Sequence, residues 1–182
     1  MADTPKKIIC IEDESEMIDL VKLILSRYGF EVVGADGGRA GLEAIKEHKP
    51  DLVLLDLMMP DMDGWEVYQK MKTDEELKEI PVIVVTAKAQ SIDKVLGLHI
   101  AKVDDYITKP FQEQEVLARV EMHLALRAAQ KQLEGKNAQL EREIAEWKSL
   151  YQRLEYPVLL TSATKGIGVE DFRSLVSDKI SL

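Results

Sequence analysis

Short aliphatic runs alternate with longer amphipathic segments from Lys6 to about Ala125. The hydrophobic periodicity predicts strands at 7–11, 31–35, 51–56, 81–86 and 103–107, and helices at 15–28, 38–47, 64–73, 91–99 and from near Gln112. Every position from 52 to 55 is aliphatic, so both faces of that strand should be buried, as in a parallel sheet covered by helices. Five strands alternating with five helices predict an α/β fold, a doubly wound parallel sheet with right-handed crossovers.

The length of 182 residues suits one α/β domain of ordinary size and an appendage. We expect the α/β domain at 1–126, a long helix at 127–155 and a strand-turn-helix tail at 156–182. That tail is either the start of a truncated output domain or a segment that packs on something else.

Charge and cysteine content narrow the function classes. A formal net charge of -9 argues against a nucleic-acid-binding face, which needs clustered basic residues. The single cysteine, Cys10, has no disulfide partner within the chain, as is usual in the reducing cytoplasm. Neither a signal peptide nor a run of membrane-spanning length is found. We therefore expect a cytoplasmic protein with no direct contact with nucleic acid or membrane.

Polar residues of useful types follow four of the predicted strands. The first strand ends in Glu12-Asp13-Glu14, the third in Asp56, the fourth in Thr86, and the fifth runs into Lys109. Because ligands of parallel sheets bind at the carboxyl ends of the strands, these side chains should meet at one rim. Each also has an ordinary alternative, such as a solvated loop aspartate, a strand-end hydroxyl or a surface ammonium. The three histidines, by contrast, lack metal-ligand spacing and are expected at the surface or the domain boundary: His48, His99 and His123.

Converging carboxylates repel one another, so this rim requires a cation. Mg2+ takes one or two carboxylates together with waters and phosphate oxygens. A lysine and a hydroxyl at the same rim would complement the remaining oxygens of a phosphoryl group. The residues by themselves therefore predict a metal-assisted phosphoryl acceptor with Asp56 as the nucleophile.

Several motifs together resemble the receiver domain of bacterial two-component response regulators, over about residues 5 to 126. They are Glu12-Asp13, Leu-Asp-Leu-Met-Met-Pro-Asp-Met-Asp-Gly around Asp56, Thr86-Ala87, and Asp-Asp-Tyr-Ile-Thr-Lys-Pro-Phe at 104–111. The resemblance implies a flavodoxin-like fold in which Asp56 takes a phosphoryl group from a histidine kinase or a phosphotransfer protein. It also implies that the protein is not an enzyme in the usual sense, since it catalyses only its own phosphoryl transfer and dephosphorylation.

The resemblance further implies the Mg2+ ligands. Glu12 and Asp13 match the acidic pair of the family, Asp13 binding the ion directly and Glu12 mainly through water. Asp56 and the backbone carbonyl of Met58 match the remaining protein ligands.

The switch residues are implied in the same way. Thr86 matches the hydroxyl that turns toward the phosphoryl group, and Lys109 matches the ammonium that pairs with it. Tyr106 matches the aromatic residue that moves inward with Thr86. The Lys109-Pro110 peptide bond matches one that is cis in the family. One departure is visible: receivers usually have Gly-Ala before Asp-Asp, where this chain has Lys102-Val103.

A helical pattern continues beyond the receiver-like part with no proline and one glycine, Gly135. Heptad spacing predicts a coiled-coil seam at positions a and d: Leu126, Gln130, Leu133, Asn137, Leu140, Ile144, Trp147, Tyr151 and Leu154. Asn137 at an a position favours two strands in register, and charges at g and e attract in a parallel pair: Lys136 with Glu141, and Glu143 with Lys148. We therefore expect a parallel homodimer, and the alternative is a single solvated helix.

Pro157 should end this helix. The stretch Thr-Ser-Ala-Thr-Lys-Gly-Ile-Gly-Val-Glu-Asp-Phe at 161–172 weakly resembles the last guanine-contacting segment of P-loop GTPases. The chain has neither Gly-x4-Gly-Lys-Ser/Thr nor Asn-Lys-x-Asp, so it is not expected to bind GTP in the usual way.

Three function classes compete. The first is a phosphorylation-dependent switch that drives a coiled-coil dimer. The second is a constitutive dimeric scaffold that uses the receiver as a docking platform, against which the intact set of Glu12, Asp13, Asp56, Thr86 and Lys109 argues. The third, a phosphatase on the same sheet, would need a further catalytic acid or nucleophile, and we find none.

Overall fold

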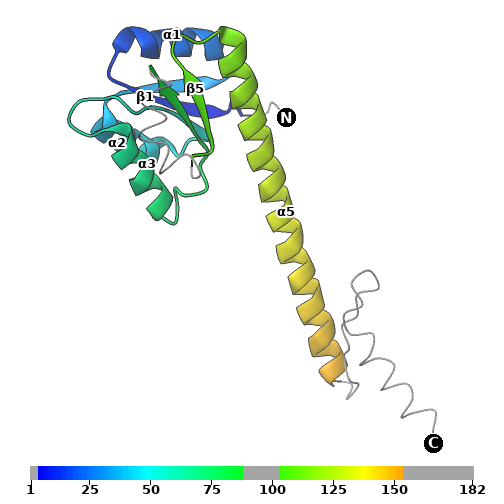
Figure 1. The fold of residues 1–182 in the computed structure, drawn as a ribbon. Helices are drawn as coiled ribbons and strands as arrows, with labels where there is room; N and C mark the ends of the chain where they lie inside the picture. The colour runs from blue at the N-terminus through cyan, green and yellow to red at the C-terminus, as the bar shows by residue number, and fades with distance from the viewer. Residues whose placement is uncertain (1–3, 88–102, 154–182) are drawn as a thin grey trace, which may run out of the picture. The chain divides into compact units, whose positions relative to one another are not determined.

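The computed structural model describes residues 4–87 and 103–153, and Figure 1 shows its fold. The elements follow the order β1 (Lys7–Glu12), α1 (Ser15–Ser26), β2 (Glu31–Asp36), α2 (Gly38–His48), β3 (Leu52–Asp56), α3 (Gly64–Thr73), β4 (Val82–Thr86), β5 (Asp105–Thr108) and α5 (Glu113–Arg153). The chain divides into two compact units, Met1–Ala129 and Gln130–Leu182.

The five strands form one parallel sheet in the order β2-β1-β3-β4-β5. Strand β1 pairs with β2 on one side and β3 on the other, so the chain reverses its direction of winding there. This confirms the predicted doubly wound fold. In such a sheet the ligand site lies outside the carboxyl ends of the strands, at the point where the winding reverses.

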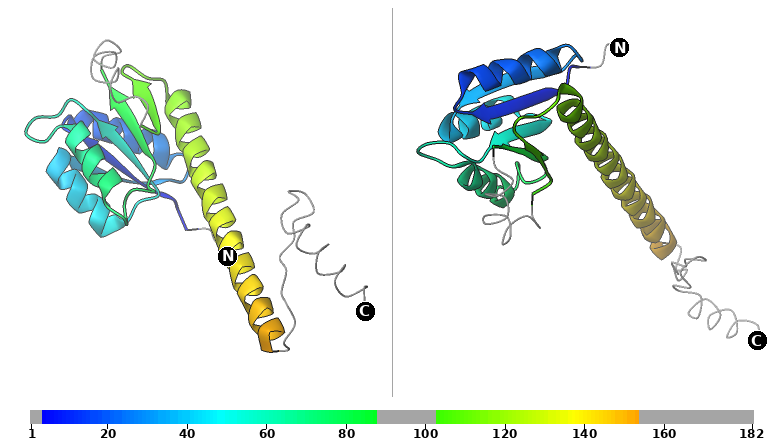
Figure 2. Two further views of the ribbon diagram at one scale, coloured as in Figure 1. Left: turned by 60° about the horizontal axis from the view of Figure 1, so that its bottom comes forward. Right: turned by 45° about the horizontal axis from the view of Figure 1, so that its top comes forward.

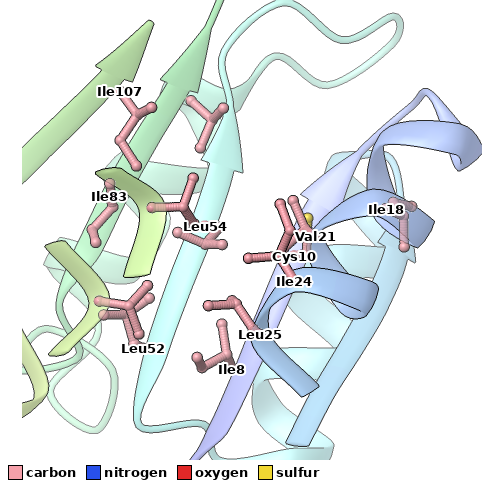
Figure 3. Close-up of a cluster of buried hydrophobic side chains, with 13 residues drawn as sticks. Ile8, Cys10, Ile18, Val21, Ile24, Leu25, Leu52, Leu54, Ile83 and Ile107 are labelled. Atoms are coloured by element: carbon pink, nitrogen blue, oxygen red, sulfur yellow. The ribbon is translucent and has the colours of Figure 1, made fainter. Parts of the chain in front are cut away.

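Helices cover both faces of the sheet (Figures 1 and 2). Residues of alternate parity along each strand point to opposite faces. One face packs against α1 and α5, and its buried cluster includes Leu54, Ile83 and Val21 (Figure 3). Val116 of α5 belongs to the same cluster. The other face packs against α2 and α3 through residues such as Leu55. Because both faces are covered, the central strands β3 and β4 are buried at every position, as the unbroken aliphatic runs predict.

Strand β5 begins at Asp105, later than the predicted start at 103. The reason is the side chain of Asp104, whose Oδ2 accepts the backbone N–H of Val82 at 2.8 Å and the ammonium of Lys72 at 2.9 Å. Because the Asp104 side chain accepts the N–H of Val82, the first residue of β4, the backbone pairing of β4 with β5 starts one residue later, with Ile83 opposite Asp105. The predicted helix at 91–99 lies outside the described residues.

The first helix ends at Ser26, two residues before the predicted end. Gly29 follows with φ +83°, a conformation that ordinary L-residues rarely adopt, and turns the chain toward β2. The Lys109–Pro110 peptide bond is cis, as the resemblance implies.

In the second unit, the described residues are helical from Gln130 to Arg153, which agrees with the predicted long helix. Its large apolar side chains are exposed, including Leu133 at 60% and Leu140 at 55%. The seam residues Tyr151 and Leu154 and the tail at 156–182 lie outside what is described at side-chain level. Among the described helices, none is both long enough and apolar enough to cross a membrane.

Candidate functional site

Three buried polar side chains stand at the carboxyl ends of neighbouring strands. Glu12 closes β1, Asp56 closes β3 and Thr86 closes β4, and their exposed fractions are only 2%, 4% and 1%. Strand order places β3 between β1 and β4, so Asp56 lies in the middle of the row. The predicted meeting of these residues at one rim of the sheet is therefore present.

Lys109 joins two of these carboxylates. Its Nζ lies 2.5 Å from Oε2 of Glu12 and 2.6 Å from Oδ2 of Asp56, and the lysine side chain is only 10% exposed. The other oxygen of Asp56, Oδ1, accepts the backbone N–H of Met58 at 2.9 Å. Removing either partner of such a buried ion pair leaves a charge without compensation, which is costly. One ammonium against two carboxylates also leaves the cluster with a net negative charge.

The environment raises the pKa values of both Glu12 and Lys109. Burial raises the pKa of Glu12 to about 7; the charge of Asp56 adds to the increase and the hydrogen bond from Lys109 opposes it. For Lys109, burial lowers the pKa, but the hydrogen bonds and charges of Asp56 and Glu12 outweigh burial and raise it overall. The lysine is therefore charged at neutral pH, while Glu12 titrates near pH 7.

The loop after β3 folds tightly over Asp56, and its sequence explains why. Asp61 adopts φ +65°, which aspartate tolerates better than most residues. The side chain of Asp63 caps α3 by accepting the backbone N–H of Glu66 at 2.8 Å. At Gly64, an added Cβ would lie 2.0 Å from the backbone oxygen of Asp56, so only glycine fits. The Asp-x-Asp-Gly motif thus brings the start of α3 against the end of β3.

The residues present fit a divalent cation. One carboxylate oxygen from each of Glu12, Asp13 and Asp56 lies within 4.8 Å of the others. Oε1 of Glu12 is buried and finds no hydrogen-bond partner among the residues that the structure describes, which is unfavourable for a carboxylate unless another positive group reaches it. Mg2+ prefers oxygen ligands such as these carboxylates, whose negative charge Lys109 neutralises only in part. The peptide of Met58 lies beside Asp56, and its carbonyl as a further ligand stays a prediction.

Tyr106 and Thr86 lie on neighbouring strands. Val84 is in register with Tyr106, and Thr86 with Thr108, so the side chains of Tyr106 and Thr86 are diagonal neighbours on the same face of the sheet. Tyr106 is 40% exposed, whereas Thr86 is buried. Their proposed movement together stays a prediction, but the register brings them within reach of each other.

One cluster, between β5 and α5, was not predicted. His123, expected at the surface or boundary, is 7% exposed, and its Nε2 lies 3.1 Å from Oδ2 of Asp105. Arg119 also binds Asp105 and lies over the ring of Tyr106. Arg119 and His123 are four residues apart on one helix, and that spacing was the only available signal in the sequence.

Comparison with known proteins identifies the architecture. The family model described as "Response regulator receiver domain" matches residues 8–121. The receiver domain of a signal transduction histidine kinase from Syntrophus aciditrophicus is 30% identical with a TM-score of 0.61, over 66% of this chain and 90% of that chain. The N-terminal domain of a response regulator receiver protein from Methanoculleus marisnigri JR1 is 35% identical with a TM-score of 0.51, over 64% of this chain and 94% of that chain.

A third structure shows the same fold at lower identity. It is the receiver domain of the sensor histidine kinase PA1611 from Pseudomonas aeruginosa PAO1, described with a magnesium ion coordinated in its active site cleft. It is 23% identical with a TM-score of 0.61, over 66% of this chain and 98% of that chain. With the family match over residues 8–121 and the acidic rim around Asp56, the first unit of this chain belongs to the response regulator receiver domain family of two-component systems.

Proposed function

We propose that this protein is a phosphorylation-dependent response regulator that accepts a phosphoryl group on Asp56 from a histidine kinase or a phosphotransfer protein and transmits the change to a parallel coiled-coil dimer. The observation that carries the first part is the ammonium of Lys109 bridging Glu12 and Asp56 at the carboxyl edge of the sheet. A nucleophilic carboxylate forms the bond to phosphorus, while an acidic neighbour that can help to bind a metal ion and a fixed cation that offsets phosphoryl charge favour the transfer.

In the transfer, a carboxylate oxygen of Asp56 forms a bond to phosphorus as the bond from phosphorus to the donor histidine nitrogen breaks. The histidine keeps the electron pair of that bond and takes up a proton. Negative charge then lies on the phosphoryl oxygens, next to the ammonium of Lys109. Thr86, at the end of the neighbouring strand β4, is the residue whose hydroxyl would turn toward these oxygens. A preorganised cation stabilises such charge without rearranging. The protein catalyses only this transfer and the later hydrolysis, and acts on no separate substrate.

Glu12, Asp13, Asp56 and the Met58 carbonyl would hold Mg2+ at this rim. When bound, the ion supplies neutralisation of phosphoryl charge and of the acidic cluster. Of the three carboxylates, those of Glu12 and Asp56 are buried, whereas Asp13 is exposed.

The test is mass spectrometry of the intact protein after incubation with acetyl phosphate and Mg2+. We expect the mass gain of one phosphoryl group in the parent and none at that site in Asp56→Asn. Asp61→Asn is the matched control, because it changes an exposed aspartate of the same loop and should leave the modification unchanged. An Asp56→Asn protein that gains the phosphoryl mass at the parent's rate would refute the assignment of the acceptor.

The second part, the dimer, is supported by the exposed apolar side chains of α5. Leu133 and Leu140 are more than half exposed, and Ile144 is 38% exposed. Their heptad spacing is that of a coiled-coil seam, and burial of a leucine side chain in a partner's hole contributes about 1.5–3 kcal/mol. Asn137 would face its own copy only in a parallel pair. An antiparallel pair would leave its amide unsatisfied at a cost of about 1–3 kcal/mol.

Cysteine crosslinking tests the dimer directly. With Cys10 replaced by serine, Leu140→Cys at a d position should crosslink two chains under oxidation. Ser149→Cys, which is exposed and off the seam, should crosslink far less. A monomer in sedimentation at micromolar concentration, or equal crosslinking at both positions, would exclude the parallel coil. Equal crosslinking at Leu140→Cys with and without phosphorylation would exclude only its coupling to the receiver.

The alternative function is a constitutive dimeric scaffold that uses the receiver as a docking platform. It requires the same dimer but gives the Lys109 bridge no role. The scaffold therefore predicts no phosphoryl mass gain on Asp56, whereas the response regulator predicts one. Both functions predict the same crosslink at Leu140→Cys.

A further inference from the structure

A cluster of charged side chains lies around β5, one of the two edge strands in the described sheet. Asp105 accepts hydrogen bonds from Arg119 Nη1 and from the backbone N–H of Tyr106, the latter at 2.8 Å. It also pairs with His123 Nε2 at 3.1 Å. Arg119 extends its second nitrogen, Nη2, toward Glu115 at 3.4 Å. None of these residues belongs to the acidic rim around Asp56.

Arg119 contacts both sides of this edge strand. Adjacent residues of a strand point to opposite faces, so the side chains of Asp105 and Tyr106 lie on different faces of β5. Arg119 nevertheless binds the carboxylate of Asp105 and has its Cζ 6.0 Å from the ring centroid of Tyr106. Its guanidinium therefore lies across the outer edge of the strand, beside the aromatic ring.

The guanidinium is held in that place. The Asp105 side chain is only 12% exposed and has three hydrogen-bonding neighbours, so it is itself fixed. Burial raises the pKa of Asp105, but the hydrogen bonds from Arg119, Tyr106 and His123 outweigh it and lower the pKa overall. Asp105 therefore remains ionised at neutral pH and anchors Arg119. A planar guanidinium anchored in this way can stack on an aromatic ring at little further cost in side-chain entropy.

We infer that Arg119 is a positioning residue that holds the Tyr106 ring in its half-exposed position in the unphosphorylated protein, and so sets how readily the ring moves inward. The inference rests on the proposed function, because it gives Tyr106 the role of the residue that moves when Asp56 is phosphorylated. Asp105 anchors Arg119, Arg119 stabilises the outward ring, and the inward ring loses that contact. A modification shifts such an equilibrium only by the difference between its interaction free energies with the two states. Arg119 stabilises the outward state of the Tyr106 ring, so phosphorylation has to overcome that stabilisation to move the ring inward.

The size of the effect follows from the contact. A cation over a tyrosine ring at a partly exposed site stabilises the pair by an amount equivalent to roughly a two- to five-fold change in an equilibrium constant. Loss of Arg119 should therefore raise the inward fraction of Tyr106 in the unphosphorylated protein by roughly two- to five-fold. Asp56 should still accept a phosphoryl group in the Arg119 variants, because Arg119 contacts no residue of the rim among those the structure describes.

The experiment follows Tyr106 by 19F NMR in protein labelled with 3-fluorotyrosine. The chain has five tyrosines, and Tyr106→Phe identifies the resonance. Its positions in the parent before and after acetyl phosphate and Mg2+ define the outward and inward states. In unphosphorylated Arg119→Gln, the resonance should move toward the inward position. Arg119→Lys keeps the charge and the pairing with Asp105 but loses the planar fork, so it should move the resonance less.

Arg142→Gln is the matched control, an exposed arginine of the same helix in the second unit, and should leave the Tyr106 resonance in place. A purely structural role for Arg119 would lower stability without moving the resonance in the folded protein. If Arg119→Gln does not fold, the comparison of Arg119→Lys with the parent decides. A Tyr106 resonance that is the same in the parent and in the folded Arg119 variant overturns the inference. Absence of any phosphoryl mass gain in the parent overturns the proposed function instead.

Discussion

Glu12 makes the receiver unit less stable as the pH rises, in the absence of divalent cations. Its ordinary pKa of 4.5 is raised to about 7 in the folded protein, mainly by burial. A group whose folded pKa is raised contributes stability that is fully present below the unfolded pKa and is lost as the pH rises through the folded pKa. The loss therefore begins near pH 4.5 and is complete above pH 7.

The magnitude follows from that interval. From 4.5 to about 7, at about 1.36 kcal/mol for each pH unit, the lost stability amounts to about 3 kcal/mol. Glu12 is only 2% exposed, so solvent screens this effect little. Within the described part of the chain its Oε1 finds no hydrogen-bond partner, which adds to the cost of burying the ionised form.

Urea unfolding in EDTA at pH 5 and pH 8 measures the effect for the parent, Glu12→Gln and Glu14→Gln. Other groups titrate in all three proteins, so the difference between variants isolates Glu12. The free energy of unfolding of the parent should fall between the two pH values relative to Glu12→Gln by most of the 3 kcal/mol. The exposed Glu14→Gln should follow the parent. Parallel pH dependence in the parent and Glu12→Gln would show that Glu12 is ionised throughout and that our account of its burial is wrong.

Two further predictions concern the same site. Thr86→Ala and Lys109→Ala should leave Asp56 able to accept a phosphoryl group, since neither residue supplies the nucleophile or a carboxylate ligand. Both variants should nevertheless lose the conformational response to phosphorylation. The assay is hydrogen exchange over residues 87–111, and a change on phosphorylation equal to that of the parent would contradict the prediction. Gly64→Ala should destabilise the receiver unit by about 1–3 kcal/mol, because its Cβ would lie 2.0 Å from the backbone oxygen of Asp56. At Gly135, an added Cβ would meet no heavy atom of the described residues within 4 Å, so Gly135→Ala should instead stabilise the helix by about 0.5–1 kcal/mol in thermal unfolding. Equal effects at the two glycines would refute the steric argument.

Local patterns in the sequence were enough to predict most of the fold. The unbroken aliphatic run at 52–55 is a property of consecutive residues, and it identifies a strand buried on both faces wherever that strand lies. The alternation of strands and helices then limits the topology to a doubly wound sheet, because crossovers between parallel strands have one hand. Asp56, Glu12 and Thr86 could be predicted as neighbours because each ends a strand of that sheet.

Contacts between distant residues were decided only by the tertiary structure. The bridge from Lys109 to Glu12 and Asp56 depends on the register of strands and on the path of one long side chain. The burial of His123 and the place of Arg119 beside Tyr106 depend on which side of α5 faces β5. Helical spacing shows which residues share a face, but only packing determines what that face meets. The late start of β5 has the same origin, because a single side-chain acceptor, Asp104, replaces a backbone partner of β4.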